Sequence, residues 1–289
     1  MFIFIDQLII SIFTSTKVFL EYLDQSNYFC RYCSDSSVLF YICLMSVVCT
    51  IWYLLSINKI YYTSVYMIAP FSIMILVCAK YVPWYTTAFF TWLLIGLGLF
   101  FRNPNRDIRD IDITQVLSPA DGIVLDVTYD VMLPRGFQDL SKLGNTSTDD
   151  DIEYADWSKV TKISIFMRVT DVHLNRAPIA GKIMRKMSFS GKFMYATAEQ
   201  ADRVNERVGL WIKGLKGSKA EVVVFQIAGM LAKRVICHAN ADDIVNLGEI
   251  YGVIQFGSRA DIYIPGNVKV LVSKEQTLLA GIDILAQWI

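Results

Sequence analysis

Charge is scarce in this chain. Charged residues make up 19% of its 289 residues, basic and acidic residues are equal at 27 each, and hydrophobic residues reach 54%. A nucleic-acid-binding protein needs a basic stripe for the phosphates, and the sequence has none, so we predict no nucleic-acid partner. The apolar composition favours a membrane-associated protein.

Histidine and cysteine are scarce as well. The chain has two histidines, His173 and His238, and Cys237 is the only cysteine after residue 101. That part is therefore no disulfide scaffold, and it suits a reducing compartment. Cys30 and Cys33 form a lone Cys-x-x-Cys pair with no second pair to complete a zinc site, so we predict no metal.

Charges almost vanish between residues 38 and 101, where Lys59 and Lys80 stand alone. Residues 38–57 have the length of a membrane-spanning helix. Two further apolar stretches follow, at 65–79 and 84–101. Either three helices cross the bilayer, or the part after residue 65 forms one span and a re-entrant or interfacial piece.

This pattern predicts three regions. Residues 1–37 suit an interfacial segment, and residues 38–101 form the membrane region. Residues 102–289 form a separate domain of soluble character, which begins with Arg102, Arg106 and Arg109. By the positive-inside rule these arginines place the domain on the cytoplasmic face of a cell membrane, of the bacterial inner-membrane type.

The domain from residue 102 on is predicted to be mainly β. Short apolar, β-branched runs bounded by turn residues are typical of strands. Pro-x-x-Gly turns recur at 119–122 and 178–181, as in the barrel-sandwich hybrids of lipoyl carriers. The polar stretch 133–157 is predicted as a solvated loop, and 196–207 as a helix or ordered loop. Strands are predicted at 123–127, 162–169, 221–227, 233–237, 252–256, 261–264 and 268–272.

The dipeptide Gly257–Ser258 lies between two of these predicted strands. A serine hydroxyl can attack the unhindered carbonyl of a preceding glycine and convert the peptide bond into an ester. Elimination and hydrolysis then leave a pyruvoyl group, a ketone made from the chain itself. Gly-Ser is also common in ordinary turns, so the dipeptide needs support from other residues.

That support comes from three separated motifs that occur in order: Ser-Pro-Ala-Asp-Gly at 118–122, the segment 166–178 around Asp171-Val-His173, and Phe-Gly-Ser-Arg at 256–259. Together they resemble the phosphatidylserine decarboxylase proenzyme family, and specifically its short subgroup with Gly-Ser-Arg at the cleavage site. The resemblance runs from about residue 100 to the C-terminus. The hydrophobic N-terminal part is similar in character only.

The resemblance implies cleavage between Gly257 and Ser258 into a β chain, 1–257, and an α chain, 258–289. It implies a pyruvoyl cofactor derived from Ser258, which acts as the electron sink when phosphatidylserine loses carbon dioxide to become phosphatidylethanolamine. The expected partners are the phospholipid substrate, the membrane and the two chains of one precursor. A homodimer remains open.

Self-cleavage needs a base for the serine hydroxyl and a group that orients the base. Histidine titrates near neutrality and suits the first task. The hypothesis is that Asp121 orients His173, which deprotonates Ser258. His238, in a polar turn, is given no role.

One position departs from the long-form members of the family. They place a second histidine three residues after the first, where this chain has Arg176. Arg176 then either shares the processing work or binds the substrate phosphate or carboxylate, for which a guanidinium is suited. Arg259 is the second predicted substrate-binding residue. The segments 191–193 with 205–207, and 226–229, also resemble the short subgroup and are candidates for the pocket.

Two other functions stay open. A membrane-anchored barrel-sandwich protein could be a transport adaptor without catalysis, which predicts long helical hairpins within the β domain. A decarboxylase of a related serine phospholipid, such as an archaetidylserine, would show the same motifs. The adaptor gives no reason for Asp121, His173 and Gly257–Ser258 to occur together.

Overall fold

The computed structural model describes most of the chain from residue 84 on. It divides the chain into two compact units, Met1–Pro104 and Asn105–Ile289, which are treated separately below. The described residues are 52, 68, 72, 84–108, 111–143, 155–198, 200–215, 220–230, 234–255 and 258–289.

The first unit is described mainly through one helix, α5, at Trp84–Phe100. Its 17 residues are uncharged and coincide with the third apolar stretch of the sequence. Over the residues that the structure describes, no helix has both the length and the apolar character needed to cross a membrane. The predicted stretches 38–57 and 65–79 lie outside the described residues, apart from single positions, so the membrane region stays a prediction.

The second unit is mainly β, with two helices of four residues each, α6 at Leu140–Leu143 and α7 at Ala201–Val204. This confirms the predicted β class with minor helix, whereas the barrel-sandwich arrangement stays a prediction. The strands are β1 Gln115–Leu117, β2 Gly122–Thr128, β3 Val160–Met167, β4 Leu174–Arg176, β5 Gly181–Phe189, β6 Arg207–Gly214, β7 Glu221–Ile227, β8 Val235–Cys237, β9 Ile244–Val245, β10 Ile250–Ile254, β11 Ser258–Pro265, β12 Val268–Val270, β13 Thr277–Leu278 and β14 Ile284–Trp288.

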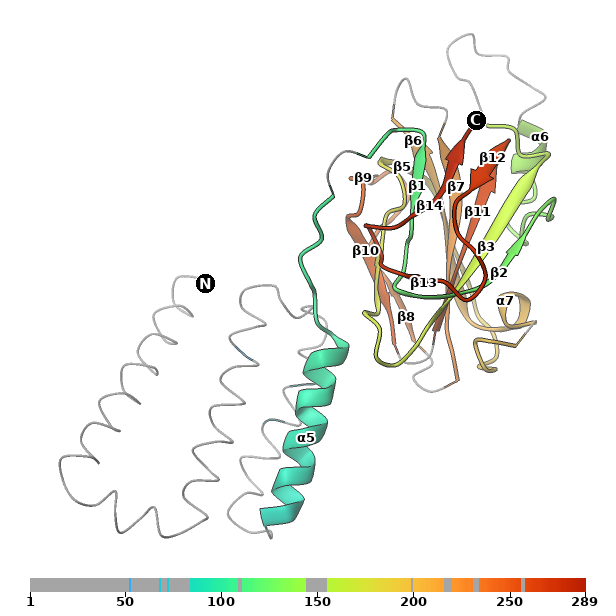
Figure 1. Cartoon of the computed structure of the whole chain (residues 1–289). Helices are drawn as coiled ribbons and strands as arrows, with labels where there is room; N and C mark the ends of the chain where they lie inside the picture. The colour runs from blue at the N-terminus through green and yellow to red at the C-terminus, as the bar shows by residue number, and fades with distance from the viewer. Residues whose placement is uncertain are drawn as a thin grey trace, which may run out of the picture. The chain divides into compact units, whose positions relative to one another are not determined.

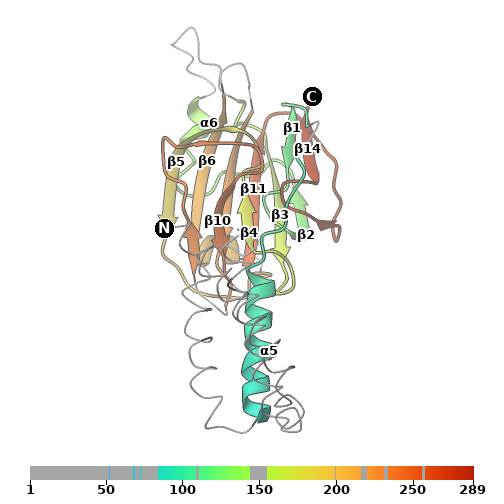
Figure 2. The same ribbon diagram turned by 90° about the vertical axis from the view of Figure 1, so that its left-hand side faces the viewer.

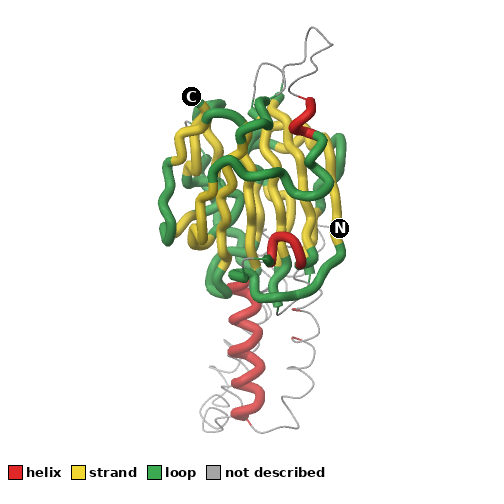
Figure 3. Tube along the Cα trace, turned by 90° about the vertical axis from the view of Figure 1, so that its right-hand side faces the viewer, coloured by secondary structure: helices red, strands yellow, loops and turns green. Residues whose placement is uncertain are grey.

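Eight strands form one curled antiparallel sheet in the order β13-β2-β3-β11-β7-β6-β5-β9 (Figure 1). Two three-stranded sheets, β1-β14-β12 and β4-β10-β8, complete the unit (Figure 2). Strands dominate the trace, and both helices lie in loops outside the sheets (Figure 3). Strand β11 lies in the interior of the large sheet, between β3 and β7.

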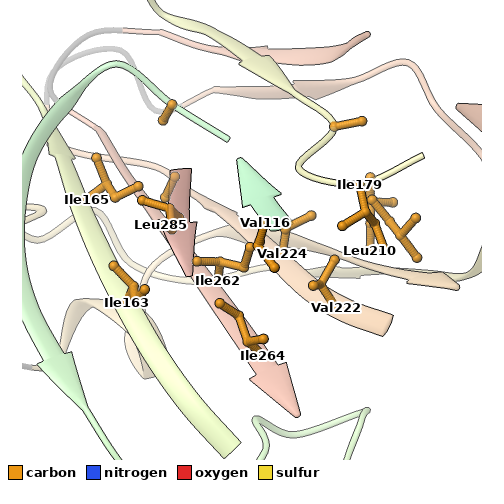
Figure 4. Packing of buried hydrophobic residues seen from close by; sticks show 14 of the residues in the cluster. Val116, Ile163, Ile165, Ile179, Leu210, Val222, Val224, Ile262, Ile264 and Leu285 are labelled. Carbon is orange, nitrogen blue, oxygen red and sulfur yellow. The ribbon is translucent and has the colours of Figure 1, made fainter. Parts of the chain in front are cut away.

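The middle of the large sheet is buried on both faces, and β7 shows how its sequence achieves this. Side chains alternate between the two faces of a strand. Val222 and Val224 enter the main core cluster, whereas Val223 and Phe225 enter a second cluster. A run of consecutive apolar residues is what a strand with two covered faces requires. Figure 4 shows the main cluster, where residues of β3, β7 and β11 pack together.

The second cluster corrects one prediction. The segment 133–157 was expected to be a solvated loop, but Phe137 and Leu140 are fully buried and Trp157 is 2% exposed. They pack on the face of the sheet that carries Phe225. Apolar residues spaced along a polar segment can cover a sheet from loops and a single helical turn such as α6, so the polar average of the segment was misleading. Residues 144–154 lie outside the described part.

The predicted strands from residue 123 to 272 are all present, and β7 has the predicted bounds. The sequence pattern does not predict β5 and β6. In β5 the charged residues Lys182, Arg185 and Lys186 interrupt the alternation, because this strand is only partly buried along its length. The predicted helix or ordered loop at 196–207 contains α7.

Candidate active site

Ser258 is the first residue of β11, and its neighbour in the ladder is Met167, the last residue of β3. The Ser258 side chain is fully buried. Its hydroxyl donates to Sδ of Met167 at 3.3 Å. Phe256 and Gly257 lie outside the described residues, so the structure locates the serine of the predicted cleavage site but not the bond before it.

His173 follows the turn that leaves the same end of β3. The turn is closed by the Asp171 amide, which donates to the Arg168 carbonyl at 2.9 Å, and by the Asp171 carboxylate, which accepts from the Arg168 guanidinium. His173 is 1% exposed, and its Nδ1 lies 2.9 Å from the Asp171 carbonyl oxygen. A carbonyl can only accept, so Nδ1 carries the proton and the neutral ring has its lone pair on Nε2.

The backbone ties His173 to the strand that leads to Ser258. The carbonyl oxygen of His173 accepts from the Ile254 amide at 3.2 Å. Ile254 ends β10, and the chain reaches Ser258 four residues later. The histidine and the serine therefore lie at the same end of β3, one after its turn and one across its ladder.

Asp121 lies in the turn before β2 and is bound from two sides. Nη2 of Arg106 contacts both carboxylate oxygens, at 2.7 and 3.0 Å. The Ala280 amide donates to Oδ1 at 2.7 Å. Burial raises the pKa of Asp121, and this outweighs the opposite effects of the Ala280 amide and Arg106. The expected contact with His173 stays a prediction, because the described bonds of this carboxylate go to Arg106 and Ala280.

Arg176, in β4, belongs to the same charged cluster. Its amide donates to the Pro119 carbonyl at 2.9 Å, and Nη1 donates to the Gly248 carbonyl at 3.0 Å. Burial lowers the pKa of Arg176, and Arg106 lowers it further, whereas Asp121 raises it. Arg106 thus contacts the Asp121 carboxylate directly, and Arg176 lies near enough for its pKa to respond to the charges of both groups.

Arg259 lies in a different cluster, on the large sheet. Its Nε contacts Oδ1 of Asp261 at 2.6 Å, and Nη2 contacts Oγ of Ser164 at 3.0 Å. Lys162 contacts Asp261 at 3.3 Å and also binds Asp202 of α7. Burial opposes the charge of Arg259, but Asp261 and Asp202 outweigh it and raise the pKa. Substrate binding by Arg259 stays a prediction.

The loop candidates come together around one side chain, Asn205. Its Oδ1 accepts from the Met194 amide at 2.9 Å, and its Nδ2 donates to the carbonyls of Met194 and Ala228 at 2.9 and 2.8 Å. The segments 191–194, 205–207 and 228 are thereby joined at the end of the sheet where β11 begins. The sequence had suggested these segments without a reason for their contact.

Three residues of the site had no predicted role: Arg106, Met167 and Asn175. Arg106 is 15 residues from Asp121, a spacing that belongs to no periodic pattern. Met167 reads as an ordinary core residue. Asn175 was the clearest missed signal, because a buried strand offers no water to an amide side chain, so a polar residue there needs a partner.

Comparisons with known proteins give one consistent family. A family model described as phosphatidylserine decarboxylase matches residues 93–286. A phosphatidylserine decarboxylase proenzyme from Geotalea uraniireducens is 37% identical over 198 residues, which are 68% of this chain and 82% of that protein. Proteins of the same name are 36% identical in Erythrobacter litoralis, covering 72% of this chain and 79% of the relative, and in Rickettsia typhi, covering 65% and 73%.

Proposed function

The chain belongs to the phosphatidylserine decarboxylase family, and from this premise we propose that it is a self-processing enzyme that converts phosphatidylserine to phosphatidylethanolamine and carbon dioxide at a membrane surface. The observation that carries the proposal is the position of Ser258. It is a fully buried serine that begins an interior strand, beside the turn that carries His173.

Self-cleavage proceeds in three steps: an acyl shift, an elimination and a hydrolysis. The Ser258 oxygen attacks the Gly257 carbonyl carbon, the C–N bond breaks, and an ester with a free amine results. Loss of the α-proton of residue 258 then expels the Gly257 carboxylate and leaves an enamine. Its imine tautomer takes up one water and releases ammonia, which gives the pyruvoyl group at the start of the α chain.

His173 is proposed as the base for the Ser258 hydroxyl. The contact of Nδ1 with the Asp171 carbonyl supports this, because it leaves the lone pair of the neutral ring on Nε2. Asp121 is proposed to support the base. The charge of Asp171, in the turn that leads to His173, raises the pKa of Asp121, which supports this role.

A pyruvoyl group at position 258 fits its surroundings. The Ser258 side chain is enclosed and faces the thioether of Met167, so water is kept from a reactive ketone. When present, this group supplies an electron sink for the carbanion left by decarboxylation. The chain holds the position through the ladder between β11 and β3.

Arg176 is proposed to bind the anionic head group of the substrate. Its guanidinium lies near the ion pair of Arg106 and Asp121, and the charges of both groups affect its pKa. A guanidinium is suited to bind a phosphate or carboxylate. Arg259 is the weaker candidate, because Asp261 already contacts two of its nitrogens.

The loops at the end of the large sheet where β11 begins support contact with an anionic membrane. They are residues 168–171, 190–206, 228–230 and 234, and their exposed side chains are called the rim below. Val169 and Tyr195 are 53% and 66% exposed, and Met194 and Met230 are 40% exposed. Among the described residues of these loops, the exposed charged side chains are all basic: Arg168, Lys192, Arg203 and Arg234. Apolar side chains among basic ones suit a bilayer of anionic lipids.

The alternatives are less well supported. A transport adaptor predicts long helical hairpins in the β domain, but the helices described there, α6 and α7, have four residues each. A decarboxylase of another serine phospholipid uses the same site, so the lipid must be identified by assay.

Intact mass spectrometry of the full chain with phosphatidylserine vesicles tests the proposal. We expect a C-terminal fragment that starts at residue 258 and carries pyruvoyl in place of a free amine, and we expect release of carbon dioxide. A chain that stays whole contradicts the proposed mechanism and favours the adaptor.

A further inference from the structure

Two buried amide side chains connect the large sheet to a small one. Asn175 lies in β4 of the sheet β4-β10-β8, and Gln226 lies in β7 of the eight-stranded sheet. Their side chains are 0% and 1% exposed. Nε2 of Gln226 donates to Oδ1 of Asn175 at 2.9 Å, so this hydrogen bond joins the two sheets from side chain to side chain.

The backbone leaves room for this bond at Gly252. This glycine is the ladder partner of Asn175 on β10. A Cβ at residue 252 would lie 2.6 Å from Nε2 of Gln226 and 2.5 Å from the Ile236 carbonyl oxygen. Any side chain at this position would therefore displace the Gln226 amide or move the strand.

The amide pair is linked to both residues of the proposed cleavage reaction through one intermediate each. Nδ2 of Asn175 lies 3.8 Å from Sδ of Met167, the same sulfur that accepts the Ser258 hydroxyl at 3.3 Å. Along the chain, Asn175 is two residues after His173, which directly precedes β4. Asn175 thus connects the segment that carries the histidine with the sulfur that holds the serine.

Stability alone does not account for the pair. Oε1 of Gln226 is buried and has no hydrogen-bond partner among the residues that the structure describes. A buried polar atom without a partner is unfavourable, whereas two apolar side chains of similar shape would fill the same space at little cost or with a gain. The polar pair is better explained by the direction that it imposes, because a hydrogen bond fixes an orientation and apolar packing does not.

We propose that Asn175 and Gln226 are positioning residues for self-cleavage. Their hydrogen bond fixes β4 against β7, and through β4 it sets His173 relative to Ser258. Neither amide contacts the reacting bond in this scheme. The inference rests on the proposed function, since it concerns the rate at which the Gly257–Ser258 bond breaks.

The first test replaces both amides by apolar side chains of similar size, in the double variant Asn175→Leu with Gln226→Met. Cleavage of the freshly synthesised full chain is followed by intact mass spectrometry. Its stability is measured by urea unfolding in a Ser258→Ala background, where no cleavage interferes. We expect an unfolding midpoint at or above that of the background and cleavage slowed by about 10- to 100-fold, as small misplacements of reacting groups produce.

Two further variants separate orientation from packing. Exchanging the residues, Asn175→Gln with Gln226→Asn, keeps a donor, an acceptor and the combined length, and we expect it to cleave about tenfold faster than the apolar pair. Gln287→Met is the matched control. It removes an amide of β14 that donates to Thr114, the residue before β1. This contact belongs to a different sheet from Ser258, so we expect cleavage at the unaltered rate.

A folded apolar pair that cleaves as fast as the unaltered chain overturns the inference. If the apolar pair fails to fold in the Ser258→Ala background, the single variant Gln226→Met, which keeps Asn175, decides by the same two readouts. An unaltered chain that never cleaves contradicts the proposed function itself. The positioning inference fails separately, when the unaltered chain cleaves and the variants match it.

Discussion

At the scale of single residues, the site combines deep burial with polar chemistry. Ser258, His173 and Asp121 are each less than a tenth exposed. Water is largely kept from such groups, so each one depends on the partner that the fold supplies. The partner of Ser258 is a thioether, that of His173 is a backbone carbonyl, and that of Asp121 is a guanidinium.

Ser258→Ala should abolish cleavage and leave the fold intact. The substitution removes the nucleophile, whereas the lost contact is a weak bond to the Met167 sulfur. We expect one uncut chain with a free energy of unfolding within about 1 kcal/mol of the unprocessed parent. Gel electrophoresis and urea unfolding measure the two effects. Ser188→Ala, at an exposed position of β5, is the control and should cleave normally.

Asp121 predicts a pH dependence of stability. Its pKa is raised in the folded protein above the usual 3.8, mainly by burial, so the folded state holds this proton more tightly than the unfolded state. The favourable contribution of the protonated form is complete below pH 3.8 and is lost as the pH rises through the folded pKa. In the Ser258→Ala background, the chain with Asp121 should therefore lose stability relative to the Asp121→Asn variant as the pH rises from 3.8 through the folded pKa of Asp121.

Urea unfolding of both proteins at a series of acidic to neutral pH values measures this difference. A gap between them that widens in favour of the parent as the pH rises would mean that Arg106 and the Ala280 amide outweigh burial.

At the scale of secondary-structure elements, the pairing of β2 with β3 depends on one glycine. Gly122 has φ of +153°, and a Cβ there would lie 2.2 Å from the Phe166 carbonyl oxygen. The obstacle is backbone of the neighbouring strand, so it cannot turn aside as a flexible side chain would. The turn that carries Asp121 ends at this glycine.

Gly122→Ala should therefore destabilise the domain strongly, by about 4 kcal/mol or more, and slow cleavage with it. Gly266→Ala is the matched control, since its φ is +80° but nothing lies within 4 Å of its Cβ position. We expect the control to lose only about 1 to 2 kcal/mol from backbone strain. Thermal unfolding in the Ser258→Ala background compares the two, and equal losses would argue against the clash.

Sequence patterns predicted the secondary-structure elements better than they predicted the contacts between residues. Strand β7 was predicted at its observed bounds, because a run of β-branched residues between polar ends is a local signal. Strand β5 was missed, since its partly exposed faces carry lysine and arginine among the apolar residues. The partners of Asp121 lie 15 and 159 residues away, and the choice between them is made by the assembled sheets rather than by local sequence.

At the scale of the whole molecule, the rim predicts a dependence on how the substrate is presented. Tyr195→Glu places a negative charge among the basic side chains of the rim. We expect about a tenfold or greater loss of decarboxylation with phosphatidylserine in anionic vesicles. Activity on a short-chain, monomeric phosphatidylserine should change little, because that substrate needs no docking.

Tyr129→Glu is the matched control for the rim. Tyr129 is 59% exposed and follows β2, at the opposite end of β3 from Met167. It should leave both activities unchanged. Equal losses with vesicles and with monomers for Tyr195→Glu would place this residue in the substrate pocket instead of on a membrane-facing surface.

The position of β11 bears on the order in which the sheets assemble and the chain is cleaved. From Ser258 on, the chain contributes an interior strand of the large sheet, the strand β13 paired to β2, and the strand β14 paired to β1. Residues 258–289 are thus interwoven with the rest before any bond is cut. Scission at Ser258 would leave two polypeptides that share their sheets and separate only on denaturation. Besides being the source of the pyruvoyl group, the Gly257–Ser258 bond would then serve assembly, so the two pieces, synthesised apart, would lack the linkage that brings them together.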